Sequence, residues 1–310
     1  MKGWRIGKMS ALTTGVKRFN RENWKAYFLL FPSLLIFAFF MFWPFIYTIY
    51  LSFFDWNMIS PTKEFVGLQN YIDILTDPKS YKIFGNTFIY IAILLVLNCV
   101  VPYVFAFVID MVLKRFKGFY KGALFMPAFI SLVVGSILFT WILNPVSGPV
   151  AIILGWFGLE MPIWSKMDGW VIFVLSLITS WKVFGYNFIV LYASINGISR
   201  ELIEAARLDQ VPLWRIFFQI VLPMSSATGI YVFIITIVQG LQYVFTPIKV
   251  ITQGGPNYAS SNAIYHAYHE AFVLYRTGHS AALSILTMVI FLVLLFIEIK
   301  FVERGIYYEN

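Results

Sequence analysis

The sequence predicts an all-α membrane protein with six transmembrane helices and cytoplasmic N and C termini. Its composition is the first indication: the 310-residue chain is 60% hydrophobic and only 12% charged, whereas about one quarter of a soluble domain is charged. The second is a series of apolar runs near the roughly 20 residues that a helix needs to cross a bilayer. The third is the uneven distribution of Lys and Arg between alternate loops.

The predicted spans follow one another in chain order. They are Ala26 to Phe54, Ile83 to Ile109, Gly122 to Leu143, Gly169 to Ile198, the outer two-thirds of Ile216 to Ile248, and Ser280 to Ile297. The first run is too long for the apolar part of a signal peptide and lacks a small-residue cleavage site after it, so we expect it to be retained. These runs predict a basic segment at 1–25, a transmembrane domain at 26–298 and a tail at 299–310.

Lysine and arginine predict the orientation, because cytoplasmic loops collect them. Sixteen of the 23 Lys and Arg residues lie in the N-terminal segment, the loops after spans two and four, and the C-terminal tail, whereas six lie in the alternate loops. We therefore expect both termini and the loop at 199–219 to be cytoplasmic. This bias also explains the net charge of +8, so we predict no nucleic-acid partner and a lipid bilayer as the surroundings.

Two local patterns refine the prediction. Pro44 and Pro102 lie inside spans and indicate kinks. Backbone groups that lose their helical hydrogen bonds at a kink need hydrogen-bond partners from neighbouring residues. In the outer loop before the last span, apolar residues from Ile264 to Tyr275 recur at three- and four-residue steps. This spacing predicts a helix along the outer surface, with Ser260 or Ser261 as its N-cap.

The loop after span four contains the charged stretch IEAARLDQVPLWRIFFQIVLP, residues 203–223. Glu201 to Leu208 are good helix formers, the next three residues suit a turn, and Pro212 is favourable in the first turn of a second helix. A helical hairpin on the cytoplasmic face would be a rigid protrusion able to enter a cleft of another protein. The alternative is an amphipathic loop that lies on the lipid surface.

Four segments of the sequence carry a family resemblance. EAARLDQVPLWRIFFQIVLP resembles the EAA loop of permease subunits in bacterial ABC importers that use an external binding protein. FVGLQNYIDILTDP, VITQGGPNYASSNAIYHAYHEAF and GHSAALSILTMVIF resemble the carbohydrate-uptake branch, with its maltose-type and glycerol-3-phosphate-type permeases. The resemblance runs from Trp24 to Arg304. It departs from the family pattern at Gln210, where the family has a glycine suited to positive φ and a side chain costs about 1 kcal/mol or more.

The resemblance implies a type I ABC importer permease fold and a heteromeric complex. Its expected partners are a second homologous permease, two ATP-binding subunits and an extracytoplasmic solute-binding protein. The resemblance also implies that the loop enters a groove of an ATPase subunit, where Glu204 pairs with a basic residue. The sequence contains no G-x-x-x-x-G-K-[ST] phosphate loop, so we expect ATP and Mg²⁺ on the partner subunits and no cofactor on this chain. The coupling residues would be Glu204, Ala205, Ala206, Leu208, Asp209, Gln210 and Pro212.

Polar groups within spans four and five are candidates for a solute pathway. An ionisable residue at mid-span suggests a functional site, and Lys182 has this position. Its charge could meet a carboxylate, backbone carbonyls, water in a cavity or an anionic solute. For the other polar groups the alternative is bonding between helices. The candidate pathway residues are Trp181, Lys182, Tyr186, Asn187, Gln239, Gln242 and Tyr243.

Other chemistries have little support. His266, His269 and His279 can bind zinc in principle, but no carboxylate–histidine helix motif accompanies them, so we predict no metal site. No catalytic triad or carboxylate pair is recognisable, and we expect a transport subunit rather than an enzyme. We predict import of a sugar or oligosaccharide, with glycerol-3-phosphate or another polyol phosphate as the alternative. An autonomous secondary transporter or channel is a remote alternative, because intramembrane carboxylates are nearly absent.

Overall fold

The computed structural model describes residues 21–302, and these residues are mostly helical. The chain forms two compact units, Met1–Thr48 and Ile49–Asn310. The described part of the first unit contains α1 (Arg21–Phe37), the π-helical turn η1 (Ala38–Phe42) and most of α2 (Trp43–Leu51). The second unit begins with the end of α2, and the short strands β1 (Phe54–Asp55) and β2 (Glu64–Phe65) then pair antiparallel.

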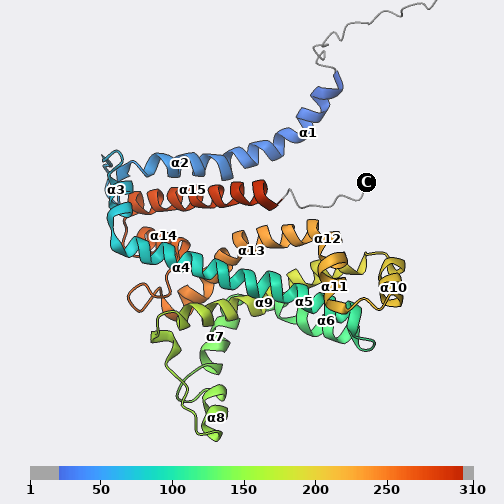
Figure 1. The fold of residues 1–310 in the computed structure, drawn as a ribbon. Helices are drawn as coiled ribbons and strands as arrows, with labels where there is room; N and C mark the ends of the chain where they lie inside the picture. The colour runs from blue at the N-terminus through green and yellow to red at the C-terminus, as the bar shows by residue number, and fades with distance from the viewer. Residues whose placement is uncertain (1–20, 303–310) are drawn as a thin grey trace, which may run out of the picture. The chain divides into compact units, whose positions relative to one another are not determined.

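The remaining elements of the second unit are helical, and most are labelled in Figure 1. They are α3 (Gln69–Thr76), α4 (Pro78–Leu95), η2 (Val96–Val100), α5 (Val101–Phe107), η3 (Val108–Val112), α6 (Lys117–Phe125), η4 (Met126–Phe129), α7 (Leu132–Ile142), α8 (Pro149–Trp156), η5 (Trp164–Lys166), α9 (Trp170–Asn196), α10 (Arg200–Leu208), α11 (Leu213–Ile216), η6 (Phe217–Val221), α12 (Leu222–Met224), α13 (Ser226–Pro247), η7 (Ile248–Thr252), α14 (Ala263–Phe272) and α15 (Thr277–Val302).

Within residues 21–302, five helical stretches are long and apolar enough to cross a membrane, and a bent pair of helices makes a sixth if it counts as one span. The prediction of a multi-span helical protein is therefore confirmed. The five stretches are Tyr27–Leu51, Pro78–Val112, Trp170–Asn196, Ser226–Thr252 and Thr277–Ile297.

The third predicted span, Gly122 to Leu143, is sharply bent in the structure. Lys117–Phe129 and Leu132–Ile142 are two helices that meet at 101°. Between them Ile130 and Ser131 have extended backbones, with ψ of 137° and 133°. The run from Gly122 to Leu143 is apolar throughout, and hydropathy alone does not reveal a change of direction.

Three of the prolines within helical stretches follow π-helical turns. Each is the second residue after such a turn: Pro44 follows η1, Pro102 follows η2 and Pro223 follows η6. Proline has no backbone N–H, and its ring would clash with the carbonyl four residues earlier. A widened turn relieves that clash, so Pro78–Val112 continues through Pro102 as one 35-residue span.

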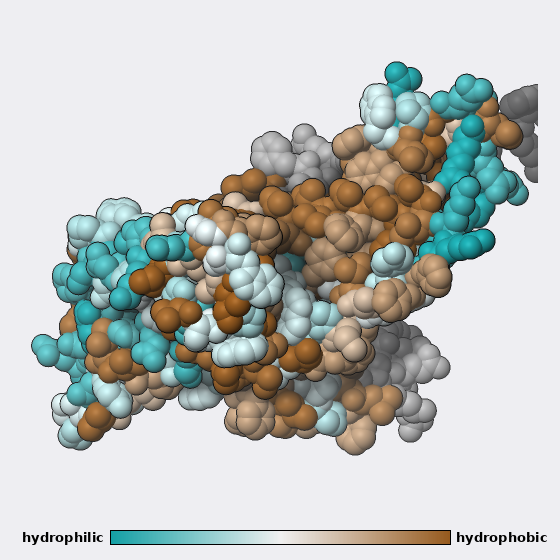
Figure 2. Space-filling model, turned by 90° about the horizontal axis from the view of Figure 1, so that it is seen from below, coloured by the Kyte–Doolittle hydropathy of each residue, from teal (hydrophilic) through white to brown (hydrophobic). Residues whose placement is uncertain are grey.

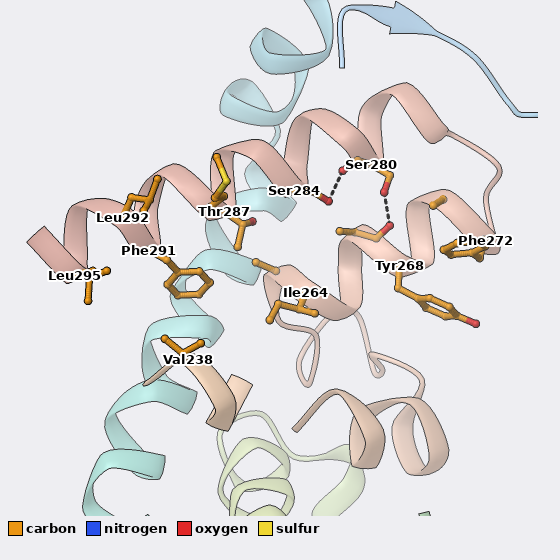
Figure 3. A pocket seen from close by; sticks show the side chains of 14 residues that line it. Val238, Ile264, Tyr268, Phe272, Ser280, Ser284, Thr287, Phe291, Leu292 and Leu295 are labelled. Atoms are coloured by element: carbon orange, nitrogen blue, oxygen red, sulfur yellow. Dashed lines mark hydrogen bonds between the residues drawn. The ribbon is translucent and has the colours of Figure 1, made fainter. Parts of the chain in front are cut away.

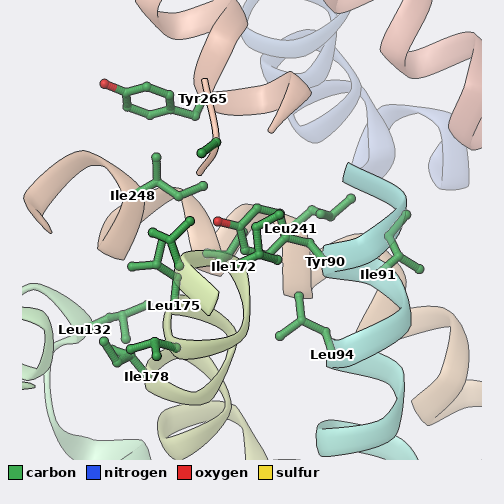
Figure 4. Close-up of a cluster of buried hydrophobic side chains, with 14 of the residues drawn as sticks. Tyr90, Ile91, Leu94, Leu132, Ile172, Leu175, Ile178, Leu241, Ile248 and Tyr265 are labelled. Carbon is green, nitrogen blue, oxygen red and sulfur yellow. The ribbon is translucent and has the colours of Figure 1, made fainter. Parts of the chain in front are cut away.

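The helix α9 lies at the centre of the second unit. It packs against α4, α5, α6 and α13, and two clusters of buried apolar side chains lie along it. Figure 4 shows one of them, in which α4 contributes Tyr90 and Leu94, α9 contributes Ile172 and Leu175, and α13 contributes Leu241. On the face shown in Figure 2, hydrophobic residues cover the middle and polar residues gather towards the two ends.

The outer helix α14 begins later than the sequence suggested. Its N-cap is Asn262, whose Oδ1 accepts a hydrogen bond from the Tyr265 N–H at 2.8 Å, so the prediction of Ser260 or Ser261 is wrong. The helix packs against α15 and has a largely buried inner face. A groove of about 550 Å³ runs between α14, α15 and Val238 of α13 (Figure 3). Its lining is mostly apolar, and Ser280 and Ser284 already donate to backbone carbonyls, which leaves few donors for a sugar.

Candidate coupling loop and transport pathway

The charged loop forms the expected helix, turn and second helix. Its first helix, α10, ends in a Schellman motif, in which the N–H of Val211 bonds to the Ala206 carbonyl and the N–H of Gln210 bonds to the Arg207 carbonyl. This motif requires a left-handed residue after the helix, and Gln210 has a φ of 56°. The turn is therefore of the kind that glycine favours, although glutamine occupies it.

The two faces of α10 have different surroundings. Ile203 and Ala206 are buried in a cluster with Ile109 and Met111 from the end of span two. Of the predicted coupling residues, Ala206 thus points into the protein and is unable to meet a partner directly. The other predicted coupling residues are exposed, and Leu208 is 83% exposed. They are Glu204, Ala205, Leu208, Asp209, Gln210 and Pro212.

Side-chain bonds fasten α10 to the end of span two. Arg200 Nη2 lies 3.1 Å from Asp110 Oδ1, and Arg207 Nη2 donates to the Met111 carbonyl at 2.6 Å. The hydrogen bond to Asp110 raises the pKa of Arg200 further above its ordinary value. Sequence reasoning missed this contact. It used Arg200 only to orient the loop and treated Asp110 as a residue at a span end.

Lys182 lies at the bend in the third span. Its Nζ donates to the carbonyls of Ala128 and Ile130, at 2.9 and 2.6 Å. These carbonyls lie at the break between η4 and α7, where the regular hydrogen bonding of the helix stops. Backbone carbonyls, one of the four alternatives considered for the Lys182 charge, therefore meet the ammonium group.

Trp181 packs against the second arm of the same bend. Its ring lies edge-on to Phe139 of α7, with centroids 5.3 Å apart. A Cβ on Gly135 would come within 3.2 Å of the indole, so a larger residue there would displace it. Trp181 and Lys182 together brace both sides of the break.

Asn187, one of the predicted pathway residues, has a side chain that is only 1% exposed. Its Nδ2 donates to the Asn98 carbonyl at 2.6 Å and lies 3.1 Å from Thr236 Oγ1. Asn98 is four residues before Pro102, so its carbonyl is the one that the proline leaves without a helical partner. Asn187 supplies that partner.

The remaining candidates lie on exposed or half-buried surfaces. Tyr186 is exposed and lies near Tyr231 of α13, an exposed residue that the sequence patterns did not single out. Tyr231 and Gln242 are eleven residues apart, close to three helical turns, and therefore share one exposed side of α13. That spacing was the signal that could have identified Tyr231. Gln242 and Tyr243 are exposed, and Gln239 is half-buried.

A buried cluster of ionisable residues lies where α14 meets α15. Three basic groups surround Glu270: His279 Nδ1 at 3.3 Å, Arg276 Nη1 at 3.4 Å and His266 Nε2 at 3.5 Å. Burial opposes ionisation of Glu270, but its basic neighbours outweigh that effect and lower its pKa overall. Burial also lowers the pKa of His266 to about 4. Within residues 21–302, no group of three His, Cys, Asp or Glu side chains is placed to hold a metal ion.

The described residues thus form a set of apolar helices able to span a membrane, with a charged helical hairpin packed against the end of the second long stretch. Residues 114–306 match the family "Binding-protein-dependent transport system inner membrane component". The chain is 30% identical over 289 residues to the probable ABC transporter permease protein YurN of Bacillus subtilis, an alignment that covers 92% of this chain and 98% of YurN. The chain belongs to this family of inner membrane permeases.

Two further comparisons agree with that assignment. The sn-glycerol-3-phosphate transport system permease protein UgpA of Escherichia coli is 28% identical over 291 residues, covering 93% of this chain and 97% of UgpA. A crystal structure of a bacterial ABC transporter that imports the acidic polysaccharide alginate contains a chain with the same fold. The TM-score is 0.80 at 22% identity, with 92% of this chain and 96% of that chain covered.

Proposed function

We propose that this chain is the membrane-spanning subunit of an ATP-driven importer for a carbohydrate, with α10 as the element that couples it to a separate ATPase subunit. The observation that carries the proposal is the rigid α10 hairpin, whose outer face exposes Glu204 and Leu208 while its inner face is packed on the spans. An exposed leucine beside a carboxylate suits a contact with a partner. The family assignment and the missing phosphate loop support the same role.

The proposed complex contains a second homologous permease, two ATP-binding subunits that hold ATP and Mg²⁺, and a solute-binding protein outside the membrane. The α10 end of the protein would face the cytoplasm, in keeping with the distribution of Lys and Arg. Closure of the ATPase subunits would move the hairpin and open the pathway outward. The candidate pathway is the exposed surface of Tyr186, Tyr231 and Gln242, which offers hydrogen bonds and aromatic faces to a sugar.

A second candidate solute is glycerol-3-phosphate or another polyol phosphate, because UgpA is named for that transport and resembles this chain over nearly its whole length. Mass spectrometry of the solute that co-purifies with the cognate binding protein separates the two candidates. A phosphorylated polyol would replace the carbohydrate proposal.

The coupling role is tested by Glu204→Lys in the assembled complex. We expect solute-stimulated ATP hydrolysis and transport to fall at least about tenfold, because reversing a charge at a desolvated contact costs several kcal/mol. Glu160→Lys is the matched control, since Glu160 is also an exposed carboxylate but lies in the connection between α8 and η5. Full transport by a normally expressed Glu204→Lys complex would exclude the coupling role.

A further inference from the structure

Asp110 is a buried carboxylate near the end of the second long span. It lies on η3, the last helical turn before the chain becomes extended at Leu113, and its side chain is 1% exposed. An ionised carboxylate is unfavourable among apolar side chains unless a cation compensates it. The compensating groups therefore indicate what this residue does.

Arg200 and Lys117 compensate the charge of Asp110, and both approach the same oxygen atom. Arg200 Nη2 lies 3.1 Å from Oδ1 and Lys117 Nζ lies 3.8 Å from it. The other oxygen, Oδ2, is buried and accepts no hydrogen bond from the described residues. Because Arg200 is the first residue of α10 and also donates to Asn196 Oδ1 at 2.8 Å, it joins the end of α9, the start of α10 and η3.

A second bond acts on the same pair of elements two helical turns further along α10. Arg207 is seven residues after Arg200 and therefore lies on the same face of the helix. Its Nη2 donates at 2.6 Å to the carbonyl of Met111, the residue next to Asp110. Ile203, three residues after Arg200 and four before Arg207, is on the same face and is buried in the cluster with Ile109 and Met111. Thus α10 is attached to η3 at both of its ends.

We propose that Asp110 is a positioning residue for energy coupling: it holds α10 through Arg200, beside the bond from Arg207 to the Met111 carbonyl, so that movement of the hairpin also moves span two. This inference rests on the proposed role of α10 as the ATPase contact. Without this clamp, only the apolar packing of Ile203 and Ala206 against Ile109 and Met111 would join α10 to span two, and such packing is not directional. With the clamp, a push on α10 reaches Pro78–Val112, a span about 90 residues earlier in the sequence.

The test is a double-mutant cycle in the reconstituted complex with its ATPase subunits and binding protein. The variants are Asp110→Asn, Arg200→Gln and the double variant, and the measurement is solute transported per ATP hydrolysed. We expect each single variant to keep ATP hydrolysis while this ratio falls about tenfold, and the double variant to be no worse than either single one, since all three lack the same contact. Arg200→Lys keeps the charge and should restore part of the ratio.

A purely structural role would give a different result. Yield, thermal stability, ATP hydrolysis and transport would then fall together, and the ratio would not change, which would overturn the inference. If Asp110→Asn protein is not recovered, Arg200→Gln decides, because the Arg200 side chain is half exposed and tolerates substitution better. Asp168→Asn is the control, since it breaks an exposed ion pair with Lys82 and should leave the ratio unchanged.

The comparison with Glu204→Lys separates this inference from the proposed function. If Glu204→Lys abolishes coupling while Asp110→Asn and Arg200→Gln keep the normal ratio, the clamp is wrong and the role of the hairpin stands. If a normally expressed Glu204→Lys complex also keeps full solute-stimulated ATP hydrolysis and transport, the coupling role of α10 itself fails.

Discussion

Gln210 has a backbone conformation that is unfavourable for a residue with a side chain, because a left-handed φ brings Cβ close to the following carbonyl. We expect Gln210→Gly to keep transport and to raise the free energy of unfolding by about 1 kcal/mol. Thermal unfolding of the purified complex measures the gain. Asp209→Gly is the control, since Asp209 has an ordinary φ of −73° and glycine there should lower stability. A severe loss of transport in Gln210→Gly would instead show that the Gln210 side chain contacts the partner.

Lys182 donates hydrogen bonds to two backbone carbonyls at the bend of the third span. We expect Lys182→Met to lower thermal stability and yield, because each carbonyl left without a donor costs about 1–3 kcal/mol. Lys166→Met, at an exposed lysine outside the spans, should leave both unchanged. A Lys182→Met complex with normal yield and basal ATP hydrolysis but no transport would contradict this. It would point to an anionic solute at the ammonium group.

At the scale of elements, the contact between α14 and α15 should make stability depend on pH. The pKa of His266 is lowered to about 4, so between pH 6.5 and pH 4 the unfolded chain binds a proton that the folded protein does not. This contribution to the free energy of unfolding is therefore fully present above about pH 6.5. It is lost as the pH falls, and the free energy of unfolding is lower by about 2 kcal/mol at pH 5. The lowered pKa of Glu270 acts in the same direction at more acid pH.

Thermal unfolding at pH 7 and pH 5 measures this dependence. His266→Gln should remove most of the difference between the two pH values. His269→Gln, at the half-buried neighbour one turn away, should keep it. An unchanged difference in His266→Gln would show that His266 is not the source of the pH dependence.

For the whole molecule, dependence on partners distinguishes an importer subunit from an autonomous transporter. We expect vesicles that contain only this chain to show no solute uptake, with or without ATP, because the chain has no phosphate loop and few intramembrane carboxylates for ion coupling. Adding the second permease, the ATPase subunits and the loaded binding protein should produce ATP-dependent uptake. Uptake by the single chain, driven by a proton or sodium gradient, would contradict the importer assignment.

The sequence by itself determined most of the helical spans, the hairpin at residues 199–219 and the family. These features depend on local information: the length of an apolar run, the residues of a turn and a motif contiguous in the chain. The helix of the hairpin and its turn at Gln210 could thus be predicted from a few neighbouring residues.

Only the tertiary structure decided the bend of the third span and the partners of the buried polar groups. Lys182 meets carbonyls 52 and 54 residues away, Asn187 meets one 89 residues away, and Arg200 meets a carboxylate 90 residues away. Hydropathy marks such residues as unusual inside a span but contains no information about which distant group lies opposite. Three-dimensional packing brings these groups within hydrogen-bond distance, because a buried charge or carbonyl is stable only where the fold supplies a partner.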